Sequence, residues 1–225
     1  MPEKSRAGEE SEEVMRNLVA IAVPALIVLV VGSCGKSTRA GSPTDYYPLT
    51  VGSVWKYRLY EHDSTGKPDV EHPMQRSTVR IARKDKLASE EEAVMVVTRN
   101  ELPYVFVETT FVRQSGGYIL EFRKRDSKTS DTLLAVPPAQ GKGWHRVSRV
   151  ATPIPVRFAD QQAVTVKAGT YPQTWHTVEE SESIRYKASS WYAPGVGLVK
   201  YYSETARKDG STFAMTHELT DASVK

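Results

Sequence analysis

The sequence predicts an all-β fold built mainly of antiparallel strands. From residue 46 onward, short runs of alternating apolar and polar residues recur between turn signals, and this two-residue period is typical of half-buried strands. No stretch there has the pattern of a convincing amphipathic helix, although residues 84–92 could hold one short helix. We therefore expect a curved open sheet or half barrel, with an N-terminal helical segment and at most one or two further short helices.

The first predicted strand shows the pattern most clearly. Trp55, Tyr57 and Leu59 alternate with polar or amphipathic neighbours. Further strands are predicted at residues 78–82, 93–99, 104–113, 118–125, 144–150, 163–167, 174–179, 189–193, 198–204 and 212–219. Such a meander buries one face, so it must curl into a barrel, fold into a sandwich or cover its concave side with a lid. The pattern leaves these alternatives open.

Glycine-containing turns separate several of these strands. Residues 114–117 and 208–211 each read as a tight hairpin in which glycine supplies a positive φ. Gly195 and Gly197 are predicted to shape another turn, where a Cβ would obstruct the backbone. A short internal echo relates Pro48, Gly52 and Trp55 to a second set with the same spacing, Pro137, Gly141 and Trp144. The echo suggests two similar half-sheets, with chance as the alternative.

The N-terminus contains an apolar run, residues 18–31, without a polar side chain. Its 14 residues are fewer than the roughly 20 that a membrane-spanning helix needs, but they suit the apolar core of a signal peptide. Pro24 weakens any long helix within the run. The alternative, a buried core helix, would show polar positions on one face.

The last residue of this run and the three that follow it, Val31-Gly32-Ser33-Cys34, resemble the lipobox of bacterial lipoproteins. Small residues before the cysteine let a signal peptidase close around the backbone, and the cysteine sulfur is the atom that takes up the lipid. Cys34 is also the only cysteine of the chain. We therefore predict cleavage between Ser33 and Cys34, and membrane attachment through lipid on Cys34.

The chain divides into four predicted regions. Residues 1–14 are acidic, the wrong charge for the start of a signal peptide, so they are either a cytoplasmic extension or precede the true start at Met15. Residues 15–33 form the signal peptide, and residues 34–45 form a lipidated tether with a reach of roughly 18 Å. Residues 46–225 form a single β domain.

Composition argues against several functional classes. The net charge of +3 is not gathered into a basic stripe, so nucleic acid is not an expected partner. A single cysteine and scattered histidines give no metal-ligand spacing, and we expect no metal and no cofactor. The glycines near Lys36 lack the spacing of a phosphate-binding loop, and the chain has no G-x-S-x-G motif. Enzymatic activity is not expected.

Three motifs resemble a family of uncharacterised bacterial lipoproteins. They are Tyr47-Pro48-Leu49-x2-Gly52-x2-Trp55-x-Tyr57, Val166-Lys167-Ala168-Gly169-Thr170-Tyr171, and Trp191-Tyr192-Ala193-Pro194-Gly195-Val196-Gly197-Leu198-Val199-Lys200. In that family they follow one another as YxPLxxGxxWxY, AGTY and WYAPGVGLVK. The resemblance implies a curved antiparallel sheet similar to the half barrels of periplasmic lipoprotein carriers, and it implies no established activity.

Aromatic residues on the predicted strands supply the functional hypothesis. A ligand or partner face is predicted to contain Trp55, Tyr57, Trp144, Trp175, Trp191 and Tyr192. Such a face would bind an apolar ligand or an envelope protein without catalysis, at the outer membrane facing the periplasm if the host is Gram-negative. The alternatives are an ordinary β core in a structural or assembly lipoprotein, and an envelope hydrolase.

Overall fold

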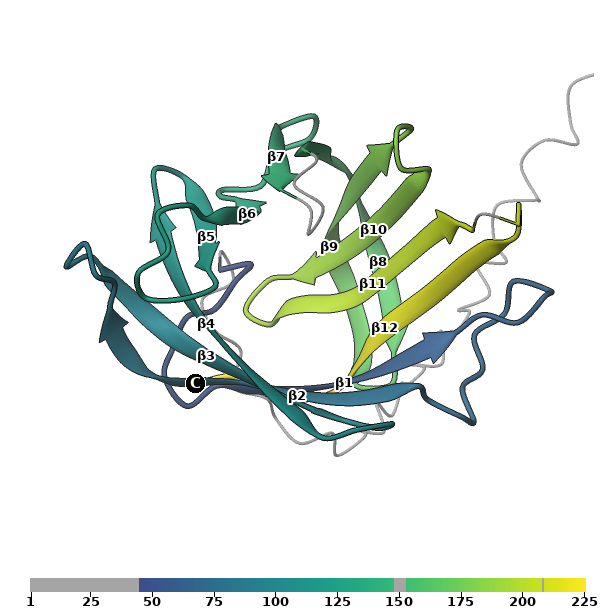
Figure 1. Cartoon of the computed structure of the whole chain (residues 1–225), viewed down its shortest axis with the longest axis horizontal. Helices are drawn as coiled ribbons and strands as arrows, with labels where there is room; N and C mark the ends of the chain where they lie inside the picture. The colour runs from purple at the N-terminus through teal and green to yellow at the C-terminus, as the bar shows by residue number, and fades with distance from the viewer. Residues whose placement is uncertain (1–44, 148–152, 208) are drawn as a thin grey trace, which may run out of the picture. The chain divides into compact units, whose positions relative to one another are not determined.

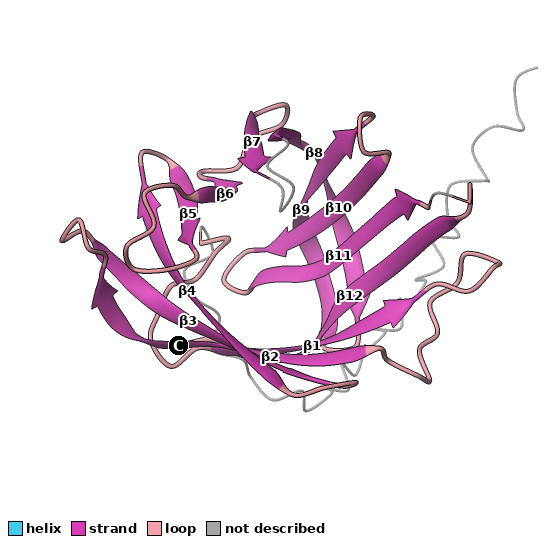
Figure 2. Ribbon diagram, in the orientation of Figure 1, coloured by secondary structure: helices cyan, strands magenta, loops and turns pink. Residues whose placement is uncertain are grey.

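The computed structural model describes residues 45–147, 153–207 and 209–225, all within the compact unit Ser37–Lys225. These residues form twelve strands in one sheet and no helix (Figure 2), so the all-β prediction is confirmed. The strands are β1 (Val54–Glu61), β2 (Gln75–Lys86), β3 (Glu92–Glu101), β4 (Phe106–Ser115), β5 (Tyr118–Phe122), β6 (Asp131–Ala135), β7 (Gly143–Val147), β8 (Pro153–Val166), β9 (Gly169–Ser181), β10 (Tyr186–Ala193), β11 (Gly197–Ala206) and β12 (Thr212–Ser223).

The sheet is an antiparallel meander that curls into a nearly closed barrel (Figure 1). Each strand pairs with its neighbours in sequence, and β1 pairs with β12, so the spatial order is β6-β5-β4-β3-β2-β1-β12-β11-β10-β9-β8-β7. The two edge strands, β6 and β7, lie next to each other without a hydrogen-bonded ladder. The barrel is therefore open along one seam. Because successive strands run in opposite directions, the connections alternate between its two ends.

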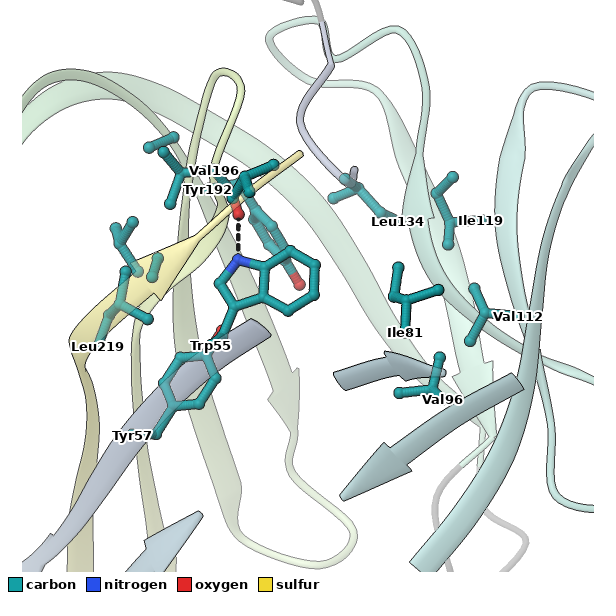
Figure 3. Close-up of a cluster of buried hydrophobic side chains, with 14 of the residues drawn as sticks. Trp55, Tyr57, Ile81, Val96, Val112, Ile119, Leu134, Tyr192, Val196 and Leu219 are labelled. Carbon is teal, nitrogen blue, oxygen red and sulfur yellow. Dashed lines mark hydrogen bonds between the residues drawn. The ribbon is translucent and has the colours of Figure 1, made fainter. Parts of the chain in front are cut away.

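Alternation of side chains places the main core on the inner face of the sheet (Figure 3). On β8, Ile154, Val156 and Phe158 are buried while the residues between them are exposed. A smaller cluster occupies the outer face, because Phe111 and Phe122 alternate with inward-facing neighbours and pack against Leu87. The sheet is thus covered on both faces near β3, β4 and β5.

Both predicted hairpins are confirmed. Ser115 of β4 pairs with Tyr118 of β5, so the turn consists of Gly116 and Gly117, with φ of 57° and 80°. These positive angles match the twist of two-residue hairpins. The second hairpin joins β11 to β12, where Ala206 pairs with Thr212.

The internal echo corresponds to a repeated local structure. The N–H of Gly52 donates to the carbonyl of Ile81 at 2.9 Å, just before β1 begins. The N–H of Gly141 donates in the same way to the carbonyl of Phe158 at 2.9 Å, just before β7 begins. Both glycines have positive φ, 89° and 76°. Each six-stranded half of the meander therefore starts with the same glycine-to-strand hydrogen bond.

Three elements differ from the sequence-based expectations. Residues 84–92 form no helix: β2 continues to Lys86, and a turn returns the chain to β3. Strand β6 was not predicted. Strand β8 starts ten residues earlier than expected, at Pro153, and Pro155 lies where β8 pairs with β7 but not with β9. A proline is tolerated there because only one neighbouring strand requires the backbone donor.

The predicted signal peptide, Cys34 and the tether up to residue 44 lie outside the described residues. Within the described part of the chain, no helix is long and apolar enough to cross a membrane.

Candidate functional site

Four of the six predicted aromatic residues are buried inside the barrel, and their polar atoms are satisfied there. The indole N–H of Trp55 donates to the carbonyl of Val196 at 2.7 Å (Figure 3), and the hydroxyl of Tyr57 donates to the carbonyl of Leu198 at 2.9 Å. The indole N–H of Trp144 on β7 donates to the carbonyl of Thr132 on β6 at 3.1 Å, across the seam between these two strands. Tyr192 on β10 is buried as well. These side chains are core residues that tie neighbouring strands together.

Three aromatic rings, those of Trp144, Phe158 and Trp175, pack together inside the barrel near the seam. The ring of Phe158, which is fully buried, lies 5.1 Å from the ring of Trp144 and 5.5 Å from that of Trp175, measured between centroids. Tilted and edge-on arrangements of this kind are the favourable geometries for aromatic pairs. The interior at this level is packed with side chains.

Trp191 lies on the opposite face of the sheet. Its neighbour Ser190 pairs with Thr177 on the buried face, so Trp191 and its own partner His176 face outward. The two rings stack with centroids 4.9 Å apart and an interplanar angle of 6°. Lys200 Nζ lies 5.9 Å from the centre of the indole ring, a cation–π contact. The six aromatic residues therefore do not share one surface.

The turn between β10 and β11 contains both glycines singled out from the sequence. Gly195 and Gly197 have φ of 70° and 93°. The N–H of Gly195 donates to the carbonyl of Asp45 at 2.6 Å, and a Cβ on Gly197 would lie 3.4 Å from Pro48 Cδ. The turn is thus packed against the segment that leads into β1.

A buried ionic cluster spans the seam between β6 and β7. Arg146 on β7 contacts Asp131 of β6 at 3.3 Å and Glu179 of β9 at 3.1 Å. Glu179 is only 4% exposed. Burial lowers the pKa of Arg146, but the two carboxylates outweigh this effect and raise its pKa above the ordinary value. The guanidinium therefore remains charged and holds the two edges together.

Titratable groups near this cluster are shifted toward their neutral forms. Burial raises the pKa of Tyr192 to about 12 and raises that of Glu121. The hydroxyls of Tyr186 and Tyr201 share a hydrogen bond of 2.6 Å, and burial raises the pKa of Tyr186 as well. Arg146 engages both of its acidic partners, Asp131 and Glu179.

A pocket of about 750 Å³ lies over the end of β2, the start of β3 and the end of β4. Its lining consists of Leu49, Lys84, Asp85, Lys86, Glu91, Glu92, Ala93, Val94, Val112, Arg113, Gln114 and Arg125. The charged residues largely neutralise one another, because Arg113 pairs with Glu91 and Arg125 pairs with Asp85. In the described ranges, no group of three or more His, Cys, Asp or Glu side chains could hold a metal ion.

Exposed apolar side chains gather at one end of the barrel, in the β1–β2 and β3–β4 connections. Tyr104 is 79% exposed, and Leu102, Val105, Phe106 and Val107 are exposed beside it. Val70 and Met74 are exposed in the β1–β2 connection at the same end. We call these seven residues the apolar end. Residues 104–113 were expected to form one half-buried strand. The unbroken apolar run at residues 102–107 departs from alternation, and this departure is the sequence signal for the exposed segment.

Comparison with protein-family models finds no match, and comparison with curated proteins finds no significant match. Two solved structures are similar: a candidate lipoprotein from Parabacteroides distasonis and a candidate exported protein with a YmcC-like fold from Bacteroides fragilis. Each is 14% identical with a TM-score of 0.47. The first match covers 80% of this chain and 98% of the other, and the second covers 78% and 97%. At this identity no residue role transfers.

Proposed function

We propose that this protein is a lipid-anchored, non-catalytic protein of the cell envelope that binds another envelope protein through its apolar end. The observation that carries the proposal is the cluster of exposed apolar side chains at residues 70–74 and 102–107. Exposed apolar side chains that gather in one region often mark interaction sites in soluble domains, whereas single ones do not. The packed interior and the charged pocket favour a protein partner over an apolar ligand.

The backbone of the apolar end supports the same interpretation. Leu102 has a φ of 67°, a left-handed conformation that costs a leucine about 1 kcal/mol or more. Its side chain is exposed, so burial within the chain does not offset that cost. A strained conformation that holds apolar side chains in solvent is consistent with a surface shaped for a partner.

The apolar end lies opposite to the end of the barrel where the described chain begins. Asp45 lies beside the β10–β11 turn, whereas the β3–β4 connection lies at the other end. Up to about 40 Å separate the two ends, the length of a strand of 12 residues such as β2. The segment that leads into β1 therefore does not cover the apolar end, which stays accessible to a protein partner.

The proposal can be tested by photo-crosslinking in intact cells that produce the full chain. A benzophenone amino acid replaces Tyr104 at the apolar end or, as the control, the exposed Val51 at the opposite end. We expect a discrete protein adduct from position 104 that position 51 does not give. An identical set of adducts from both positions, or none from position 104, would contradict the proposal.

A further inference from the structure

Strand β4 has an open edge along half its length. On one side β4 pairs with β3 from Val112 to Phe106. On the other side β5 pairs only with Phe111–Ser115, because β5 ends at Phe122. In the described part of the chain, no strand covers the backbone of residues 106–110 on that side. This edge adjoins the apolar end and contains two of its residues, Phe106 and Val107.

The open part of β8 shows how an edge in the same sheet is protected. Beyond Phe158, whose backbone still bonds to Gly141 and Lys142, β8 is no longer covered on the side of β7. That stretch carries register shifts between Phe158 and Gln161 and between Gln162 and Val164, and it exposes Asp160. Bulges and charges are the usual protection of edge strands against further pairing. Residues 106–110 have no register shift and no proline, and they begin with two exposed apolar side chains. Their single charge is the exposed Glu108.

We propose that the partner adds an extended strand to the β4 edge at residues 106–110. This inference rests on the proposed function and specifies how the partner binds. A row of unpaired backbone N–H and C=O groups is complementary to another strand rather than to a helix. Five residues give a docking length of about 17 Å. Main-chain hydrogen bonds would supply affinity, and the exposed side chains of β4 would supply specificity.

The side chains of the edge define the chemistry of the partner strand. Val107 and Thr109 lie on one face, while Phe106 and Glu108 lie on the other. Glu108 is exposed and takes part in none of the ion pairs among the described residues. Opposite charges placed directly across a sheet attract each other, so the matching strand is apolar with a lysine or arginine opposite Glu108.

A second copy of this chain fits the edge less well. Full antiparallel overlap of two 106–110 edges about a twofold axis places Glu108 directly opposite its own copy. Like charges in that position are destabilising. Shifted registers avoid the contact only by shortening the paired segment. The charge pattern therefore favours a different chain as the partner.

The test uses synthetic peptides and hydrogen exchange of the full chain in detergent, followed by mass spectrometry. The probe is the peptide Thr-Thr-Val-Lys-Val-Val-Thr, which places lysine opposite Glu108 in an antiparallel pairing. Its first control carries glutamate in place of lysine, and its second is N-methylated at every internal amide. We expect the lysine peptide to slow exchange at residues 106–110, with no change at residues 158–166.

The controls distinguish strand pairing from nonspecific binding of an apolar peptide. The glutamate peptide should bind roughly fivefold more weakly, and Glu108→Lys should reverse that preference. Equal protection by the N-methylated peptide, or no protection by the lysine peptide, overturns the proposal. A partner adduct at position 104 without edge protection would retain the proposed function and reject strand addition. Edge protection without any adduct in cells would support strand addition and contradict the proposed function.

Discussion

His217 is a partly buried imidazole whose surroundings favour its neutral form. Its ring lies 4.8 Å from that of Tyr57, between centroids, and opposite Tyr201 of β11. Its Nε2 atom is buried without a hydrogen-bond partner among the described residues. Burial lowers the pKa of His217 to about 4, whereas an unfolded histidine titrates near 6.5. Between these values the unfolded chain binds a proton that the folded chain does not.

The free energy of unfolding should therefore fall as the pH falls from about 6.5 to about 4, and this contribution should then level off. The unsubstituted protein should lose free energy of unfolding between pH 7.5 and pH 4.5. We expect this loss to be about 2 kcal/mol smaller in His217→Phe. Urea unfolding at the two pH values measures the difference. The control is His72→Gln, at an exposed loop histidine. If both variants lose as much stability as the unsubstituted protein, the explanation fails.

Gly197 is required by both its backbone angle and its surroundings. A Cβ there would meet a positive φ of 93° and would contact the ring of Pro48. We expect Gly197→Val to lower the melting temperature by several degrees, equivalent to about 1 to 3 kcal/mol. Gly66→Val is the matched control, because Gly66 also has a positive φ, 78°, but open space around its Cβ position. An equal loss in both variants would attribute the effect to backbone strain alone.

Single residues differ in how far the sequence revealed their roles. The role of the turn glycines could be predicted from the sequence, because few other residues adopt positive φ. Trp55 and Tyr57 were correctly placed on a strand, but their interior packing depends on strands more than 130 positions away in sequence, such as the carbonyl of Val196. Alternation alone does not distinguish a core from a binding face.

At the scale of elements, the seam between β6 and β7 depends on Arg146 in place of a backbone ladder. We expect Arg146→Met to destabilise the protein by about 3 kcal/mol, because it leaves the buried carboxylate of Glu179 unpaired. Chemical denaturation followed by far-ultraviolet circular dichroism measures this loss. The double variant Arg146→Met/Glu179→Met should recover most of it, since the remaining partner, Asp131, is 22% exposed and still accepts a hydrogen bond from the N–H of Val147. A double variant less stable than the single one would show that the ion pair itself stabilises the seam.

The elements that sequence analysis missed share a cause. β6 has only five residues, and its short apolar run is followed by Pro137. It is therefore too short to show the two-residue alternation from which the other strands were predicted. Residues 84–86 belong to the segment that could hold a short helix, but pairing with β3 determines their conformation. Tertiary pairing overrides local propensity in both cases. Long alternating strands such as β1 were predicted because their pattern is set locally.

For the whole molecule, the predicted anchor links the fold to its location. Cys34 lies outside the described residues, so its lipidation stays a prediction from Val31-Gly32-Ser33-Cys34. Metabolic labelling with a fatty acid should mark the protein in its host. Cys34→Ala should lose the label, and Ser37→Ala, three residues further on, should retain it. Equal labelling of the Cys34 variant would refute the anchor.

If an anchored barrel presents its apolar end to an envelope partner, adduct formation at position 104 must depend on the anchor. The most direct measurement is the yield of the crosslinked adduct at position 104 in cells that produce either the unsubstituted cysteine or Cys34→Ala, at matched protein levels. We expect a discrete protein adduct with Cys34 present and a large loss of it in Cys34→Ala, because the barrel is then no longer held beside its partner. The same adduct at equal yield in both strains, or no adduct in either, would contradict this expectation.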